Sequence, residues 1–234
     1  MAKRGFIVLC ILLGLAGLGW LGERLRDRDA ALRQESEKPP VLIVKQPAVL
    51  ASRTFDPAAP PADMPPLSEG DAAECDSNFV SDASVSGESR KEDATHATVT
   101  ITHVKVTLQL NVTIWLPDGA TQRIIDHEDG HRQISQYFYQ SADKIADQIA
   151  ETYIGKQVEI AGDDLNAESS KMLQQMAAEI TDEYGKELNP GLAQTLYDNI
   201  TDHSRNDIVA KDAAVAAINN AAIAAIRPAA APGN

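Results

Sequence analysis

The sequence is poor in aromatic residues, which supply 5% of its 234 positions, although hydrophobic residues make up 44%. Much of the apolar content is alanine, which favours helices but buries little surface per residue. A chain of this length allows one domain of ordinary size with attachments. The composition therefore predicts a modest core built mainly from helices.

Cysteine is also scarce, and the two that occur stand in unlike surroundings. Cys10 lies inside an apolar run, and Cys75 lies in a polar stretch. This difference disfavours an internal disulfide. Leu9 stands before Cys10, where a lipid-attachment site would have a small residue. The sequence therefore predicts neither a disulfide framework nor thiol catalysis.

Basic residues are outnumbered: 21 Lys and Arg stand against 34 Asp and Glu, which gives a formal net charge of -13 and a pI near 4.7. A surface this acidic repels phosphate backbones, so nucleic acid is excluded as an expected partner. Solubility is the plainest consequence of the charge. No internal repeat is visible.

Uncharged residues dominate the N-terminus. Between Arg4 and Glu23 the chain reads GFIVLCILLGLAGLGWLG, 18 residues without a charge. As a helix this run would reach about 27 Å, close to the hydrocarbon thickness of a bilayer. It predicts an anchor over residues 1–22, and Lys3 and Arg4 favour a cytoplasmic N-terminus with the rest of the chain extracytoplasmic, in the periplasm. A cleaved signal peptide and secretion are the alternative, although no small-x-small pattern precedes the charges.

Proline marks the next segment, since eight of the twelve prolines lie between Pro39 and Pro66. Such a composition predicts an extended, semi-rigid spacer over residues 23–94. The apolar stretch VLIVKQPAVL at 41–50 is the exception and is expected to form a strand. Residues 67–94 are rich in Ser, Asp, Glu and Ala and are expected to be irregular.

The pattern changes at residue 96. HATVTITHVKVTLQLNVTIWLP (96–117) is dense in Val, Thr and Ile and predicts one or two strands. Helices are expected beyond it, the first capped by Thr121. Their expected ranges are 122–154, 164–188, 192–203 and 206–226. The fold class predicted is α+β: a small antiparallel sheet on a predominantly helical domain over 95–227, with an N-terminal transmembrane helix and a loose tail at 228–234.

The stretch DHEDGHR (126–132) carries the chemistry. His127 and His131 are one helical turn apart, so both imidazoles can reach one ion. Neutral nitrogen donors leave the charge of Zn²⁺ uncompensated, and Glu128 can take a proton from water activated by the metal. Ile124, His127, His131, Ile134 and Phe138 follow spacings of three and four, which places the histidines on the inward face. The alternative is a pair of core histidines bonded to carbonyl groups.

The HEDGH helix resembles the His-Glu-x-x-His motif of the zincin metallopeptidases. HEDGHRQIS, together with LYDNITDHSRN near the C-terminus, is similar to a bacterial family of predicted secreted zinc-dependent proteases without an assigned function. Members of that family pair a His-Glu-x-Gly-His helix with a later Tyr-Asp-x-x-Thr-x-His segment. The resemblance covers about residues 95 to 210, and it departs from the pattern at Ser204, where glycine is expected. In zincins an edge strand beside the site helix binds extended peptide, a role that the resemblance assigns to 104–117.

A catalytic zinc needs a third protein ligand. Glu151 is excluded because a continuous helix would place it about 30 Å from the histidines. The later motif of the family favours His203, with Asp198 and Asp202 as alternatives or as partners that orient an imidazole. His96 and His103 rank lower. Tyr197 is either a hydrogen-bond donor to a developing oxyanion or a core tyrosine.

These patterns together predict a membrane-anchored zinc hydrolase that cleaves peptide bonds on the extracytoplasmic side. Its metal ligands would be His127, His131 and His203, with Glu128 and Tyr197 as catalytic groups and a peptide or protein as substrate. The rival hypothesis is a non-catalytic envelope module. AAVAAINNAAIAAI (213–226) favours it, because small residues let a partner helix approach closely.

Overall fold

The computed structural model describes residues 39–67 and 70–226, and a compact unit begins at Val41. The expected anchor at 1–22 and the tail at 228–234 lie outside the described residues. Across the ranges that are described, none of the helices combines the length and the apolar character needed to cross a membrane. The chain is a mixed α/β protein built on a five-stranded sheet.

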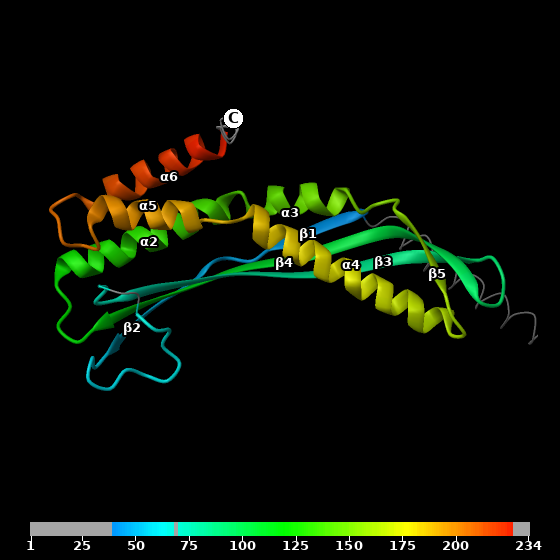
Figure 1. Cartoon of the computed structure of the whole chain (residues 1–234), viewed down its shortest axis with the longest axis horizontal. Coiled ribbons are helices and arrows are strands. Elements are labelled where there is room, and N and C mark those ends of the chain that lie inside the picture. The colour runs from blue at the N-terminus through cyan, green and yellow to red at the C-terminus, as the bar shows by residue number, and fades with distance from the viewer. Residues whose placement is uncertain (1–38, 68–69, 227–234) are drawn as a thin grey trace, which may run out of the picture. The chain divides into compact units, whose positions relative to one another are not determined.

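The sheet is organised around one long strand, β4 (His96–Pro117). Strand β3 (Glu74–Lys91) pairs antiparallel with β4 along nearly its whole length. Because β3 occupies one edge of β4, the three short strands share the other edge. They are β5 (Gln157–Ala161), which is antiparallel to β4, and β1 (Val41–Lys45) and β2 (Val49–Phe55), which are parallel to it. Figure 1 shows this arrangement.

Two expectations about the sheet are wrong. The sheet is mixed rather than antiparallel, because β1 and β2 run parallel to β4. The strand at 104–117 is not an edge strand either, since β4 has partners on both edges there. Among the described residues β3 pairs with β4 alone, so β3 carries the free edge nearest the site helix.

A bulge lets β4 keep one apolar face along its length. The register shifts between Ser86 and Gly87, so that β4 has an extra residue opposite them. Before the bulge the buried side chains of β4 are at odd-numbered positions, such as Val99 and Ile101. After it, every second residue is buried starting from Val104, at even-numbered positions. Such a bulge re-aims side chains without ending the strand. Gly87 is needed here, because an added Cβ would lie 2.7 Å from the Thr100 carbonyl oxygen.

Five helices are described: α2 (Gln122–Gln140), α3 (Ala142–Glu151), α4 (Leu165–Glu187), α5 (Gly191–Thr201) and α6 (Ala210–Ile226). The Thr121 hydroxyl accepts a hydrogen bond from the Ile124 N–H, which confirms the predicted cap. The predicted helix over 164–188 is also confirmed. The helix expected to run through Ile154 is interrupted at Ser141, where the backbone N–H bonds to the carbonyls of Phe138 and Tyr139.

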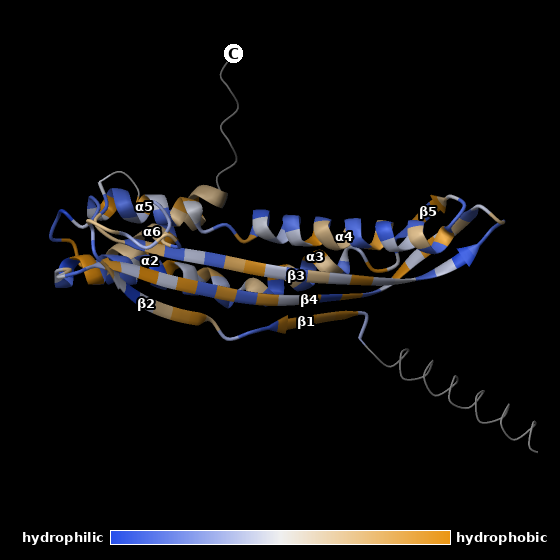
Figure 2. Cartoon of the chain, turned by 90° about the horizontal axis from the view of Figure 1, so that it is seen from below, coloured by the Kyte–Doolittle hydropathy of each residue, from blue (hydrophilic) through white to orange (hydrophobic). Residues whose placement is uncertain are grey.

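The helices lie on one face of the sheet and pack in two groups, α3 with α4 and α2 with α5 and α6 (Figures 1 and 2). The main core lies between β4 and the inner faces of α3 and α4, with Leu108, Leu110 and Ile180 fully buried. A second cluster joins α2, α5 and α6 around Ile134 and Tyr197. Four buried alanines of α6 pack into this second cluster: Ala213, Ala214, Ala217 and Ala221. The alanine-rich segment therefore contacts its own chain on one side.

The spacer interpretation of residues 23–94 is wrong for residues 74–91, whereas the strand expected at 41–50 is present. A strand was expected within 41–50, and two strands, β1 and β2, are present. Residues 74–91 were expected to be irregular but form β3, whose side chains alternate between half-buried and exposed up to Gly87. The proline-rich loop at 56–67 connects β2 towards β3 rather than holding a domain at a distance. Arg53 and Asp63 form an ion pair at 2.6 Å across the start of this loop.

Candidate metal centre

The site is built on the buried face of α2. The periodicity that placed the histidines inward agrees with the structure, since His127 is 5% exposed and Ile134 is fully buried. Glu128 is 4% exposed and lies on the side of the helix that faces β3. Burying polar groups is costly unless they find partners, so the partners of these side chains decide what the site can do.

Three potential metal ligands converge from two helices. His127 and His131 come from α2, and Asp198 comes from α5. The His131 Nε2 lies 2.8 Å from Asp198 Oδ1, and the His127 Nε2 lies 3.5 Å from the same oxygen. The two Nε2 atoms are 3.3 Å apart. In a tetrahedral zinc site with bonds of about 2.0–2.1 Å, neighbouring ligand atoms are about 3.3 Å apart, so this set has the spacing of such a site.

Gln194 fixes the tautomer of His131. The Gln194 Nε2 donates to the His131 carbonyl oxygen at 3.2 Å and to Ser135 Oγ at 3.0 Å, which orients the amide. Its Oε1 therefore faces His131 Nδ1, at 2.6 Å, as an acceptor. In a neutral imidazole the proton is then on Nδ1, and Nε2 directs a lone pair at Asp198. A contact of 2.8 Å between that lone pair and a carboxylate oxygen is favourable only if a proton or a cation lies between them.

The charges around the cluster favour a cation. Burial alone would raise the pKa of Asp198, but the hydrogen bonds from His127 and His131 outweigh it and hold that pKa below its usual range. Burial alone would lower the pKa of His131, whereas the bond to Asp198 raises it, and the net direction is upward. Both shifts describe one contact, which requires a positive charge, either a proton or a cation, between His131 and Asp198. A divalent cation held by the three atoms would meet this demand, so the residues fit a metal.

Glu128 lies beside the cluster in a cavity of about 560 Å³. The cavity is bounded by the start of β3, by α2 and by the junction between α4 and α5. Burial raises the pKa of Glu128 to about 8, and the carboxylates of Glu74, Asp71 and Asp198 act in the same direction. The carboxyl group thus lies in the same cavity as His131 and Asp198.

Tyr197 packs against the two histidines and is fully buried. Its ring stacks on the His127 ring at 5.0 Å between centroids and meets the His131 ring edge-on at 4.7 Å. The hydroxyl donates to the His127 carbonyl oxygen at 3.0 Å. The expected role as a donor to an oxyanion does not fit this geometry. The alternative, a core tyrosine that holds the histidines in place, does.

The structure gives a steric reason for Gly130, the glycine of the HEDGH motif. A Cβ at this position would lie 2.1 Å from the Tyr197 hydroxyl oxygen and 2.4 Å from its Cζ. The phenol occupies the space that any side chain at 130 would fill. The position of the tyrosine on α5 therefore requires a glycine at this point of α2.

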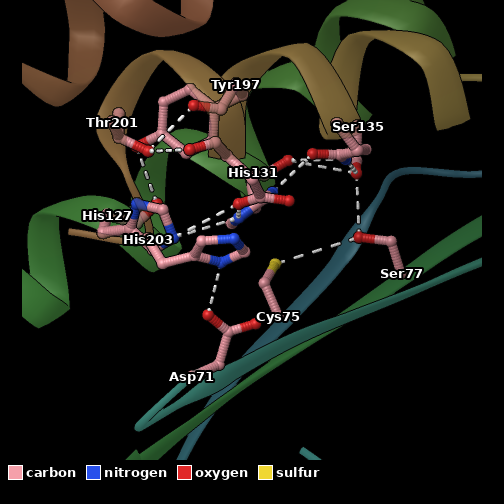
Figure 3. A network of polar contacts seen from close by, with 11 residues as sticks. Asp71, Cys75, Ser77, His127, His131, Ser135, Tyr197, Thr201 and His203 are labelled. Atoms are coloured by element: carbon pink, nitrogen blue, oxygen red, sulfur yellow. Dashed lines mark hydrogen bonds and ion pairs between the residues drawn. The ribbon is translucent and has the colours of Figure 1, made fainter. Parts of the chain in front are cut away.

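His203 stands apart from the three converging atoms. Its Nδ1 lies 2.8 Å from Asp71 Oδ1, and Figure 3 shows the imidazole directed at that carboxylate. The turn that carries it has three consecutive non-glycine residues with positive φ: Asp202, His203 and Ser204 at 48°, 50° and 65°. Such backbone is costly and persists where surrounding contacts enforce it. The left-handed φ of Ser204 accounts for the glycine expected there.

The remaining candidates fall outside the cluster. Asp202 caps α5 and pairs with Arg205 at 3.3 Å. Glu151 is exposed at the end of α3, after the break at Ser141, so its exclusion stands although the helix is not continuous. His96 bonds to Asp93 at the β3–β4 turn, and His103 bonds to Thr102 on β4.

Sequence reasoning missed two residues of the site. Gln194 lies four positions before Asp198 on α5, and this helical spacing could have indicated a shared face. Asp71 carries no local signal, because its partner is 132 residues away in the chain.

Comparison of the chain with protein-family models, with curated proteins and with solved structures found no match.

Proposed function

We propose that this chain is a zinc-dependent hydrolase that cleaves peptide bonds. The observation that carries the proposal is the convergence of His127, His131 and Asp198 within contact distance of one another beside a buried glutamate. Two histidines and a carboxylate that leave further coordination positions open are a donor set typical of catalytic zinc. The resemblance of HEDGH to the zincin motif supports the same metal and the same chemistry.

In this proposal His127, His131 and Asp198 hold the metal. His203 remains the alternative to Asp198 that the resemblance favours. Gln194 keeps the His131 Nε2 lone pair available, and Tyr197 keeps the two rings in position. Zinc, when bound, supplies Lewis-acid activation of water and of the scissile carbonyl. Glu128 takes the proton of the attacking water and then delivers it to the leaving amine.

The cavity supports a polymeric substrate rather than a small molecule. It is open to solvent, and one of its walls is the first part of β3, whose outer edge has no strand partner among the described residues. An extended peptide can pair with such an edge through its main chain. The membrane anchor at 1–22 and a location on the extracytoplasmic side are proposed from the sequence alone.

A non-catalytic envelope module remains the second candidate. One observation favours it: α6 exposes Val215 and Ile223, which are 52% and 53% exposed, on the side away from its buried alanines. A partner helix could cover that side. This candidate predicts no dependence on the carboxylate of Glu128.

The experiment that separates the two candidates is the Glu128→Gln substitution. Glutamine keeps the shape of the side chain but cannot accept a proton, so hydrolysis of an unstructured protein substrate should fall about 10²-fold or more. Zinc content and thermal stability should stay close to those of the parent. Glu187→Gln, at an exposed position on α4, is the matched control and should retain full activity. Equal activity of the parent and Glu128→Gln would contradict hydrolysis at this site.

A further inference from the structure

A second cavity continues the site cavity along the outer edge of β3. It has a volume of about 690 Å³ and lies between Ser81–Ala83 of β3 and the C-terminal half of α4. Both cavities are lined by Gly185 of α4, so they are neighbours at that residue. We call the two cavities together the β3–α4 groove. It follows β3 from Glu74 to Ala83, which is about 30 Å at the rise of a strand.

The groove has the form that an added strand requires. Among the described residues, β3 pairs only with β4, so the backbone groups on its outer edge have no ladder partner. An unpaired edge of this kind is a template for strand addition. Its inner wall on α4 includes Ala177, Ala178 and Gly185, which leave room for a backbone to approach.

The charge of the groove selects its occupant. Seven acidic residues line the two cavities, against two basic ones: His131, which contacts Asp198 at 2.8 Å, and Lys186, which is paired with Asp182 at 2.5 Å. Asp76 and Asp82 are exposed and six residues apart on β3, so they point to the same side of the strand. Cationic side chains of an added strand would lie next to them, which is a favourable cross-strand arrangement.

We propose that the β3–α4 groove binds an extended peptide segment in which lysine or arginine alternates with small residues. The cationic side chains lie along Asp76 and Asp82, and the small ones face Ala177, Ala178 and Gly185. This inference rests on the proposed function, because it identifies the substrate class of the same site. The groove delivers the segment to the cavity that contains Glu128 and the three candidate ligands.

The test uses the full chain carrying Glu128→Gln, so that the probe is not consumed. The probe is a fluorescein-labelled decapeptide in which lysine alternates with alanine, and binding is followed by fluorescence anisotropy. The peptide should bind, and its counterpart with glutamate in place of lysine should bind at least 10-fold more weakly. Raised salt should weaken the lysine peptide, since exposed charges are screened. Equal binding of both peptides would overturn the charge assignment.

Two N-methylated peptides test the strand geometry. In a strand, alternate N–H groups point to the same edge, so only one of the two alternate sets can face β3. One peptide is methylated at the lysine N–H groups and the other at the alanine N–H groups. Binding should be abolished for only one of the two peptides. Equal effects of the two methylations would overturn strand addition.

Gly185→Trp tests the location. A Cβ at Gly185 meets nothing within 4 Å, so a side chain at this position starts in open space. The variant should lose at least 10-fold in affinity at unchanged thermal stability. Gln175→Trp, at an exposed position on the same helix outside the groove, should bind as the parent does. Unchanged binding by Gly185→Trp would place the peptide elsewhere.

The binding measurements test peptide binding in the groove separately from the proposed hydrolysis. Binding with the expected pattern, but no hydrolysis by the parent chain, would contradict the hydrolase alone. If the rate of hydrolysis depends neither on the charge of the peptide nor on the Gly185→Trp substitution, peptide binding in the groove is contradicted and the hydrolase is not.

Discussion

At the scale of single residues, Gly130 and Tyr197 show how the site is held. The phenol of Tyr197 fills the place of the missing side chain, stacks on the His127 ring and bonds to the helix backbone. The two histidines are thereby fixed from behind, while Gln194 fixes His131 through Nδ1. Metal-binding histidines depend on such contacts for orientation and tautomer.

Gly130→Ala should destabilise the fold. The added methyl group would overlap the tyrosine ring, and overpacking of a filled core costs about 1–3 kcal/mol. Gly185→Ala is the matched control, because it is also a glycine to alanine change within a helix, but at a position with open space. That change should stabilise the protein by about 0.5–1 kcal/mol. Urea unfolding of the three proteins measures both effects, and equal shifts for the two variants would contradict the packing of Tyr197 on Gly130.

Asp198 and His203 compete for the position of third ligand. The structure brings Asp198 to the histidines and pairs His203 with Asp71. Asp198→Ala should therefore weaken zinc binding by at least 10²-fold, whereas His203→Ala should change it by less than 10-fold. Competition with a chromophoric chelator measures both affinities. The reverse order of the two losses would assign the third ligand to His203.

At the scale of elements, the least expected feature is β3. Its sequence, ECDSNFVSDASVSGESRK, has many Ser and Asp residues and so resembles an irregular segment. The inward positions carry Phe79, Ala83 and Val85, which pack against the core, but small and polar residues between them conceal the alternation. The pairing of β3 with β4 stabilises it, and such pairing is not local in the sequence.

Local patterns were enough for other elements. The density of Val, Thr and Ile predicted β4, and helical periodicity predicted α4 and the inward face of α2. The interruption at Ser141 and the parallel pairing of β1 and β2 were not predictable from such patterns, because both depend on how segments pack in space. The same reason applies to Asp71, whose contact with His203 spans most of the chain.

Hydrogen exchange tests the place of β3 in the sheet. β4 has partners on both edges over 104–108 and 111–115, so its consecutive amides there should all exchange slowly. β3 is bonded on one edge, so alternate amides between 75 and 85 should exchange slowly and the intervening ones quickly. Residue-resolved exchange by nuclear magnetic resonance gives both patterns. Uniformly fast exchange across 74–91 would show that this segment is irregular after all.

At the scale of the whole molecule, the fold places one acidic cavity where the sheet meets the two groups of helices. Carboxylates line this cavity, and His131 is the only basic residue among the described residues that line it. The proposed zinc would add positive charge among these carboxylates. The proposed hydrolase depends on that one ion.

The most direct test is therefore the zinc content of the purified full chain and of its His131→Ala variant. Mass spectrometry of metals, after dialysis against zinc and then against buffer, should find about one zinc per chain in the parent. The His131→Ala variant should hold little, and zinc should raise the melting temperature of the parent alone. A parent chain that stays free of metal, and whose melting temperature does not change when zinc is added, would contradict the account.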